Sequence, residues 1–228
     1  MLKENLEKVL NEISNGNNLG EEITLIGATK TMPVEIINQA ITLGLKVVAE
    51  NKVQEFREKT DLICGAKQHF IGHLQTNKVK YLVGKVHLIH SVDSLHLAGE
   101  IDRVAKNRGV IQNVLAEINI GGELSKSGFD FTNAKENVLK MNDEFKNLHV
   151  LGLMAMLPNS EDEEMLANLT KKMRALYDEL KEKGLPFSHL SIGMSGDYKI
   201  AIKNGSNMIR LGRTIFGERK TEANNGTI

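Results

Sequence analysis

Residues 190–217, LSIGMSGDYKIAIKNGSNMIRLGRTIFG, hold two short apolar runs with a helical pattern between them. Leu190–Met194 and Met208–Leu211 lack the strict alternation of half-exposed strands, which is typical of parallel strands covered on both faces. The pattern between them, Asp197–Lys203, begins directly after the first run. This stretch therefore predicts a strand, a helix and a second, parallel strand.

The same rhythm recurs along the chain. Apolar runs occur eight times, at Ile23–Ala28, Val47–Ala49, His69–Ile71, Val86–Val92, Val114–Ile120, Val150–Leu157, Leu190–Met194 and Met208–Leu211. Helical patterns separate them, at Val34–Leu43, Val53–Ile63, Asn77–Val83, Leu95–Asn107, Asn133–Phe145, Glu161–Lys183 and Asp197–Lys203. Eight such units in this length favour a closed (β/α)₈ barrel of the α/β class, with a doubly wound open sheet as the alternative.

No linker rich in Pro, Gly or Ser interrupts this rhythm, so we expect one domain over residues 1–228. An amphipathic helix is expected at 2–13, because Leu2, Leu6, Val9 and Ile13 follow the helical period. The polar tail, from about 218 to 228, is expected to fray.

Composition narrows the class of protein. The 29 basic residues balance the 29 acidic ones, which argues against a mainly electrostatic nucleic-acid or membrane binder. No apolar run approaches the roughly 20 residues of a membrane helix, and the start of the chain does not resemble a signal peptide. A single cysteine, Cys64, rules out an internal disulfide, and its helical surroundings predict a small buried residue. We therefore expect a cytoplasmic protein.

A metal site is not expected. His87 and His90 are three positions apart in a predicted strand and should point to opposite faces. The sequence contains no HExxH motif.

Lys30 directly follows the first predicted strand. In a barrel, residues that follow strands lie at the carboxyl end, where active sites form. A lysine there, flanked by apolar β-structure, is expected to be partly desolvated, which favours attack on an aldehyde or ketone. The alternative is an ordinary surface lysine.

The last two predicted strands end in segments suited to an anion. Met194 and Ser195 precede the predicted helix at 197, whose first N–H groups and dipole favour negative charge. Gly212 permits close approach of the backbone after the last strand, while Arg213 and Thr214 supply donors. Barrel enzymes often bind phosphate at these two loops. Helix capping by Ser195 or Asp197 is the alternative.

Other residues complete the expected site. Arg210 lies on the last strand at a position facing the barrel mouth, where an internal ion pair is the alternative role. Asn51 follows the second strand and is expected near a ligand ring. His73 and Lys126 follow the third and fifth strands and are weaker candidates. An imine-forming lysine beside a phosphate pocket suits pyridoxal 5′-phosphate, and it equally suits a sugar phosphate in a Schiff-base aldolase.

Seven segments together resemble one family, the YggS/PROSC family of pyridoxal-phosphate-binding proteins. They are ATKTMP, AENKVQE, HFIGHLQTNK, INIGGELSKSG, GLMAM, SIGMSGDYKIAI and IRLGRTIFG, in the family's order. The resemblance implies the fold-type III barrel of alanine racemase, with Lys30 as the Schiff-base lysine. It also implies phosphate binding around Ser195 and around Gly212 to Thr214, and Arg210 facing the pyridine nitrogen.

Two positions depart from the family pattern. Position 213 is Arg where many relatives carry a small hydroxyl residue, and position 32 is Met where some carry a second lysine.

The resemblance further implies a protein of cofactor homeostasis, acting as a monomer, that stores the aldehyde and passes it to apo-enzymes. We expect no committed reaction, because the chain has no second domain to supply an acid or base on the cofactor face. The alternatives are an amino-acid racemase of low activity and a Schiff-base aldolase. Lys126 is expected to assist cofactor transfer.

Overall fold

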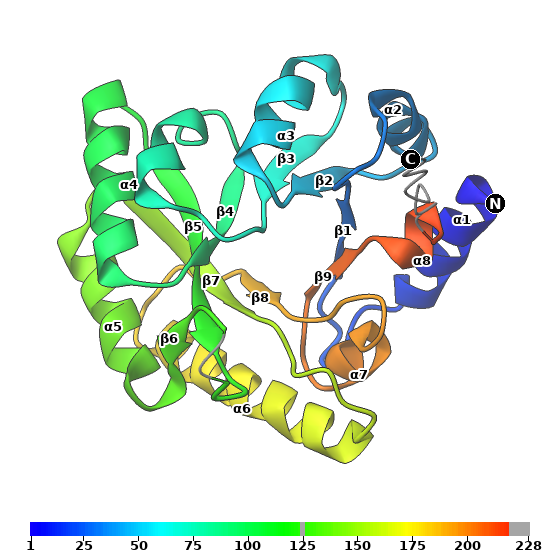
Figure 1. Cartoon of the computed structure of the whole chain (residues 1–228). Coiled ribbons are helices and arrows are strands. Elements are labelled where there is room, and N and C mark those ends of the chain that lie inside the picture. The colour runs from blue at the N-terminus through cyan, green and yellow to red at the C-terminus, as the bar shows by residue number, and fades with distance from the viewer. Residues whose placement is uncertain (124–125, 219–228) are drawn as a thin grey trace, which may run out of the picture.

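The computed structural model describes residues 1–123 and 126–218 as a barrel of parallel strands surrounded by helices (Figure 1). The barrel strands are β1 (Thr24–Ala28), β2 (Val47–Glu50), β3 (Lys67–Phe70), β4 (Leu88–Val92), β5 (Gln112–Asn119), β7 (Leu148–Ala155), β8 (His189–Ser191) and β9 (Met208–Leu211). A two-residue strand, β6 (Phe129–Asp130), pairs with the end of β5.

Strand pairing closes the sheet on itself. The order is β4-β3-β2-β1-β9-β8-β7-β5, and β5 pairs with β4 to complete the ring. Every pairing is parallel, as between β1 and β9, where Ile26 lies opposite Arg210. The predicted eight-stranded barrel is confirmed, and the open doubly wound sheet is wrong.

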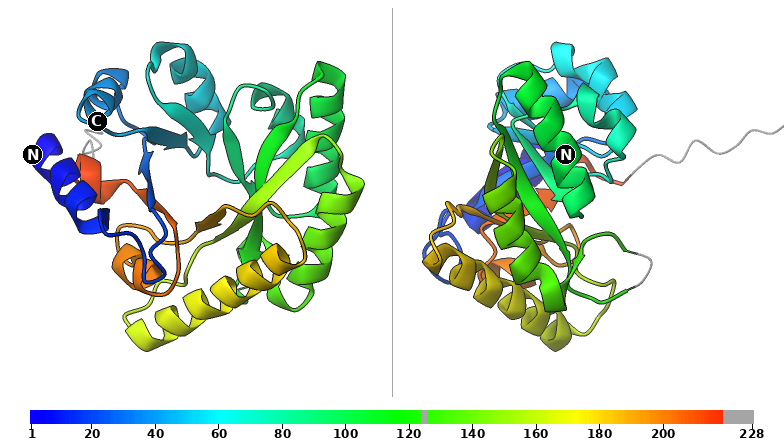
Figure 2. Two further views of the ribbon diagram at one scale, coloured as in Figure 1. Left: turned by 180° about the vertical axis from the view of Figure 1, so that it is seen from behind. Right: turned by 90° about the vertical axis from the view of Figure 1, so that its left-hand side faces the viewer.

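Helices form an outer ring around the strands (Figures 1 and 2). They are α1 (Leu2–Ile13), α2 (Val34–Thr42), α3 (Val53–Lys59), α4 (Leu95–Arg108), α5 (Phe131–Glu144), α6 (Glu163–Glu182), α7 (Tyr198–Lys203) and α8 (Arg213–Phe216), with 3₁₀ turns η1 (Thr60–Leu62) and η2 (Thr76–Tyr81). The predicted helix at 77–83 is thus the 3₁₀ turn η2. Helix α8 was not predicted, because four residues are too few to show a period.

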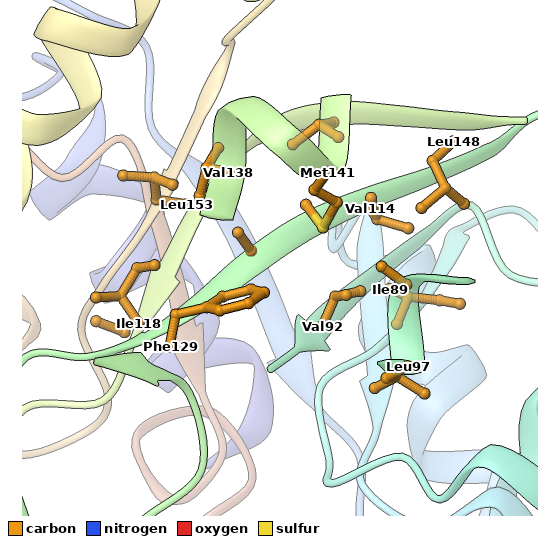
Figure 3. Packing of buried hydrophobic residues seen from close by; sticks show 14 of the residues in the cluster. Ile89, Val92, Leu97, Val114, Ile118, Phe129, Val138, Met141, Leu148 and Leu153 are labelled. Atoms are coloured by element: carbon orange, nitrogen blue, oxygen red, sulfur yellow. The ribbon is translucent and has the colours of Figure 1, made fainter. Parts of the chain in front are cut away.

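Apolar side chains fill the barrel and the layer outside it. Inside, Ile26, Leu88, Leu115 and Met154 belong to one buried cluster drawn from several strands. Outside, the alternate residues of β4, β5 and β7 pack against α4 and α5, as Val114 and Met141 do (Figure 3). Because side chains alternate along a strand, each strand contributes to both layers.

Three further expectations concern the tail, membrane helices and Cys64. The expected frayed tail lies almost wholly outside the described residues, which end at 218. Within the described ranges, no helix is long and apolar enough to cross a membrane. Cys64 is exposed, so its expected burial is wrong.

Candidate functional site

A cavity of about 450 Å³ opens at the carboxyl end of the barrel. Its volume falls in the range of roughly 300–1,000 Å³ that is typical of small-molecule sites. Seven of the eight predicted site residues line it: Lys30, Asn51, Met194, Ser195, Arg210, Gly212 and Arg213. Thr214 is not part of the wall, but its backbone N–H donates to Ser195 Oγ at 3.3 Å. The strand ends therefore bring the predicted residues together.

Lys30 sits in a tight turn after β1. Lys30 is exposed as a residue, and the expected partial desolvation of its amine stays a prediction. Its neighbour Thr31 has φ +65°, the left-handed region that a β-branched residue rarely adopts. Such strain persists only where surrounding contacts enforce it, and it often lies at functional sites.

Four side chains enforce that turn. Thr29 Oγ1 donates to Glu50 Oε1 at 2.7 Å, and the backbone N–H of Thr31 donates to Glu55 Oε2 at 2.7 Å. Lys59 joins the two carboxylates, with its Nζ 3.0 Å from Glu50 Oε1 and 2.9 Å from Glu55 Oε2. The residues on both sides of Lys30 are thus tied to one charged cluster.

Burial governs the charges of this cluster. It raises the pKa of Glu50, although the hydrogen bond from Thr29 and the Lys59 ammonium oppose the rise. Burial also favours a higher pKa for Glu55, but the hydrogen bonds from Lys59 and from the Thr31 backbone leave that pKa below the ordinary value. Burial alone would lower the pKa of Lys59, and the two carboxylates raise it instead. Lys59 is therefore held as a cation.

The loops after β8 and β9 form one wall. Asp197 Oδ1 accepts from the Met194 backbone N–H at 2.6 Å, so it fixes the turn and does not cap α7. Burial raises the pKa of Asp197. Among the described residues, the backbone N–H groups of Ser195 and Gly196 meet no protein acceptor. These groups and the Ser195 hydroxyl can bind an anion.

Arg210 lines the cavity from β9 and is 5% exposed. Its Nη1 donates to the carbonyl and to Oγ of Ser191, at 2.7 and 2.6 Å, and its Nη2 donates to the Ala155 carbonyl at 3.0 Å. Within the described part of the chain no carboxylate lies within ion-pair distance, so the alternative of an internal ion pair is wrong. Burial lowers the pKa of Arg210 to about 10, while Glu117 and Asp197 act at longer range to keep it charged.

Asn51 presents its amide at the end of β2. Its Oδ1 is buried and has no partner among the described residues. Gly72 permits this placement, because a Cβ there would stand 1.9 Å from the Asn51 carbonyl oxygen. An unmet buried acceptor on a cavity wall is suited to a polar ligand.

Of the two weaker candidates, only one lines the cavity. Lys126 lines the cavity and pairs with Glu123, its Nζ 2.8 Å from Oε1. His73 does not line it. Its Nδ1 instead lies 3.3 Å from Ser127 Oγ and 3.5 Å from Asp93 Oδ2. The segment 158–160 after β7 also lines the cavity and was not predicted, although the strand-end rule applies to it equally.

The histidines are closer together than their spacing predicts. His87 and His90 both contact the ring of His69, with centroid separations of 5.5 and 5.2 Å, so the expected separation is wrong. His87 directly precedes β4 and is exposed, whereas His90 lies inside the barrel. Over residues 1–123 and 126–218, no group of three or more potential ligands is arranged to hold a metal ion.

The fold and the site define a class of protein: parallel barrels with a lysine after the first strand and, after the last two strands, hydrogen-bond donors that can bind an anion. A sequence model described as "Alanine racemase, N-terminal domain" matches residues 5–220. The chain belongs to the pyridoxal phosphate homeostasis protein family within that class. The family member of Aquifex aeolicus is 44% identical over 220 residues, which cover 95% of each chain.

Solved structures agree with this assignment. PipY of Synechococcus elongatus, whose structure has PLP bound, is 28% identical with a TM-score of 0.83, over 95% of this chain and 100% of that one. An alanine racemase of Clostridium difficile shares the fold, with a TM-score of 0.77 at 18% identity, over 96% of this chain and 61% of that one.

Proposed function

We propose that this chain binds pyridoxal 5′-phosphate, with Lys30 as its covalent anchor, and serves the homeostasis of that cofactor. The observation that carries the proposal is the single cavity on which Lys30, Arg210 and the donors of two adjacent loops converge. PipY, a related structure, contains PLP, and the Aquifex relative is named for its homeostasis.

The residues fit the group. Pyridoxal 5′-phosphate supplies an aldehyde that condenses reversibly with an amine to form a Schiff base, and Lys30 presents one. Ser195 and the backbone N–H groups of Ser195 and Gly196 would hold the phosphate, with Arg213 beside them. Gly196 leaves room, because a Cβ there would meet nothing within 4 Å.

Two more groups would recognise the ring. The unmet acceptor of Asn51 lies on the cavity wall. Arg210 would face the ring nitrogen, since its guanidinium is fixed in the wall by three hydrogen bonds. A fixed cation opposite that nitrogen disfavours its protonation. Met194 and Gly212 complete the contacts, and Thr214 supports Ser195 from behind.

We further propose that the chain carries the cofactor and has no committed reaction. Proton transfer at a substrate carbon requires an acid or base placed over the reacting group. Among the described residues, no histidine, tyrosine, cysteine or glutamate lines the cavity. Asp197 and Lys126 do line it, but Asp197 Oδ1 accepts from the Met194 backbone N–H and Lys126 pairs with Glu123. The recipients would be apo-enzymes that use the cofactor, and the carrier would act as a monomer in the cytoplasm.

Borohydride reduction of the loaded protein, followed by peptide mapping, tests the anchor. The expected result is one pyridoxyl-phosphate adduct, on Lys30, that is lost in Lys30→Ala and kept in the exposed control Lys52→Ala. No adduct in the presence of excess cofactor would overturn the proposal.

Two measurements test the carrier role. Incubation with L-alanine in deuterium oxide should give no Lys30-dependent exchange at Cα, whereas exchange that vanishes in Lys30→Ala would establish a racemase. Mixing the loaded protein with an apo-enzyme should restore that enzyme's activity. Lys126→Ala should slow this transfer, because Lys126 offers a second amine on the same cavity.

A further inference from the structure

A buried chain of four polar side chains begins at Arg210 and crosses the interior of the barrel. Arg210 Nη1 donates to Ser191 Oγ at 2.6 Å, and that oxygen lies 3.2 Å from His90 Nδ1. His90 Nε2 lies 3.0 Å from His69 Nδ1. The four residues come from β9, β8, β4 and β3, and none is more than 5% exposed.

The hydrogen bonds that link these four side chains all point in one direction, from Arg210 toward His69. An arginine only donates, so Ser191 Oγ accepts from Arg210 and has its own proton to give. His90 Nδ1 is the acceptor within reach, which leaves the His90 ring proton on Nε2, directed at His69 Nδ1. His69 then carries its proton on Nε2, an atom that is buried without a partner among the described residues. The reverse direction would leave the Ser191 proton unmatched as well.

Both rings are neutral in this arrangement. Burial holds the pKa of His90 well below its usual range, and His69, Arg210 and His189 act in the same direction. Burial likewise depresses the pKa of His69, with His87, His189 and Lys67 adding to it. Besides the two rings themselves, the charged or titratable groups that act on them lie on β3 (Lys67), directly before β4 (His87), on β8 (His189) and on β9 (Arg210).

We propose that His90, supported by His69, is a positioning residue that fixes Arg210 through the Ser191 hydroxyl and so sets how the guanidinium acts on a bound ligand. The identity of that ligand group as the ring nitrogen of pyridoxal 5′-phosphate rests on the proposed function. The contacts among Arg210, Ser191, His90 and His69 are independent of it.

Two physical arguments support this role. A hydroxyl that donates to an imidazole becomes a better acceptor, so His90 strengthens the hold of Ser191 on Arg210. Moreover, neighbouring inward positions are apolar, such as Leu88 and Met154. Two buried imidazoles cost more to desolvate than aliphatic side chains would, so filling the barrel alone does not require them.

Nitrogen NMR of the unloaded protein tests the chain without any cofactor. Both rings should be neutral with the proton on Nε2 at pH 7. The Arg210 guanidinium should give resolved, slowly exchanging signals. In His90→Leu these signals should average together. His90→Asn, whose amide oxygen can replace Nδ1 as acceptor, should restore them, and His149→Leu, at an exposed position of β7, should leave them unchanged.

Absorption of the bound cofactor as a function of pH tests the consequence. In His90→Leu the pH midpoint of this absorption change should rise by roughly one pH unit, because a loosened Arg210 opposes protonation of the ring nitrogen less. His90→Asn should return it to the wild-type value.

Unchanged Arg210 signals in His90→Leu would overturn the inference, and so would an unchanged midpoint in the loaded protein. If His90→Leu does not fold, Ser191→Ala breaks the same contact and is expected to release Arg210 in the same way. Wild-type protein that takes up no pyridoxal phosphate would instead refute the proposed function, and the NMR measurement would still decide the role of His90.

Discussion

The ammonium group of Lys59 lies 3.0 Å from Oε1 of Glu50, and the two side chains are only 13% and 4% exposed. Glu50 holds Thr29 and, through Lys59, is linked to Glu55, which holds Thr31. Because Thr29 and Thr31 flank Lys30, a side chain of α3 controls how the turn after β1 presents the anchoring amine.

Lys59→Met should therefore destabilise the protein and impair the anchor together. Removing one partner of a buried ion pair costs about 3 kcal/mol, because the other charge remains without compensation. Two neighbouring carboxylates then repel, so the loss should be larger at pH 8 than at pH 5, where Glu50 is more easily protonated. Urea unfolding at the two pH values measures the first effect, and the rate of adduct formation on Lys30 measures the second.

Lys46→Met is the matched control, since Lys46 is exposed and lies just before β2. It should leave both quantities within error of the wild type. Equal stability of Lys59→Met and Lys46→Met would mean that the charged cluster does not hold the turn.

The sequence was sufficient to predict the barrel and most of the residues at its carboxyl end. Each strand carries its own apolar pattern, and parallel strands necessarily gather their carboxyl ends, so Lys30, Ser195 and Gly212 could be placed together without long-range information. Lys59 and His90 could not be found in this way. Their roles depend on partners from other elements, and a single buried histidine or lysine in a sequence does not specify what it contacts.

Gly72, which lies against the Asn51 backbone, and Gly196, which lines the cavity, should respond differently to alanine. A Cβ on Gly72 would stand 1.9 Å from the Asn51 carbonyl, so Gly72→Ala should displace the backbone and lower stability by about 1–3 kcal/mol. A Cβ on Gly196 meets no protein atom within 4 Å, so Gly196→Ala should leave the unloaded protein as stable as the wild type. It should nevertheless weaken cofactor binding about tenfold, the effect of roughly 1.4 kcal/mol of steric conflict.

Thermal unfolding and cofactor titration of both variants decide the matter. Undiminished affinity in Gly196→Ala would place the phosphate elsewhere on the wall.

Arg213 should contribute charge to phosphate binding without being essential for it. The side chain is exposed and lines the cavity, and exposed ion pairs contribute at most about 1 kcal/mol. Arg213→Gln should therefore weaken binding roughly threefold to fivefold at low salt, and less at high salt, where the charge is screened. Titration at two salt concentrations measures this, with Lys203→Gln on the exposed side of α7 as the control. No change in affinity would show that Arg213 points away from the phosphate.

Glu117 should make the stability of the unloaded protein fall between weakly acidic and alkaline pH. The side chain is 3% exposed, and burial, together with the charge of Asp93, raises its pKa to about 7, against the attraction of Arg210. Between the ordinary pKa of 4.5 and about 7, the folded state therefore binds more protons than the unfolded state, so the free energy of unfolding decreases as pH rises through this window. The interval corresponds to roughly 3 kcal/mol.

Glu117→Gln keeps the side chain at position 117 neutral at every pH. It should match the wild type near pH 4 and exceed it by up to that amount at pH 8, whereas the exposed control Glu22→Gln should show no such divergence. Denaturant unfolding across this range is the measurement, and parallel stability curves for Glu117→Gln and the wild type would mean that Glu117 is ionised at little cost beside Arg210.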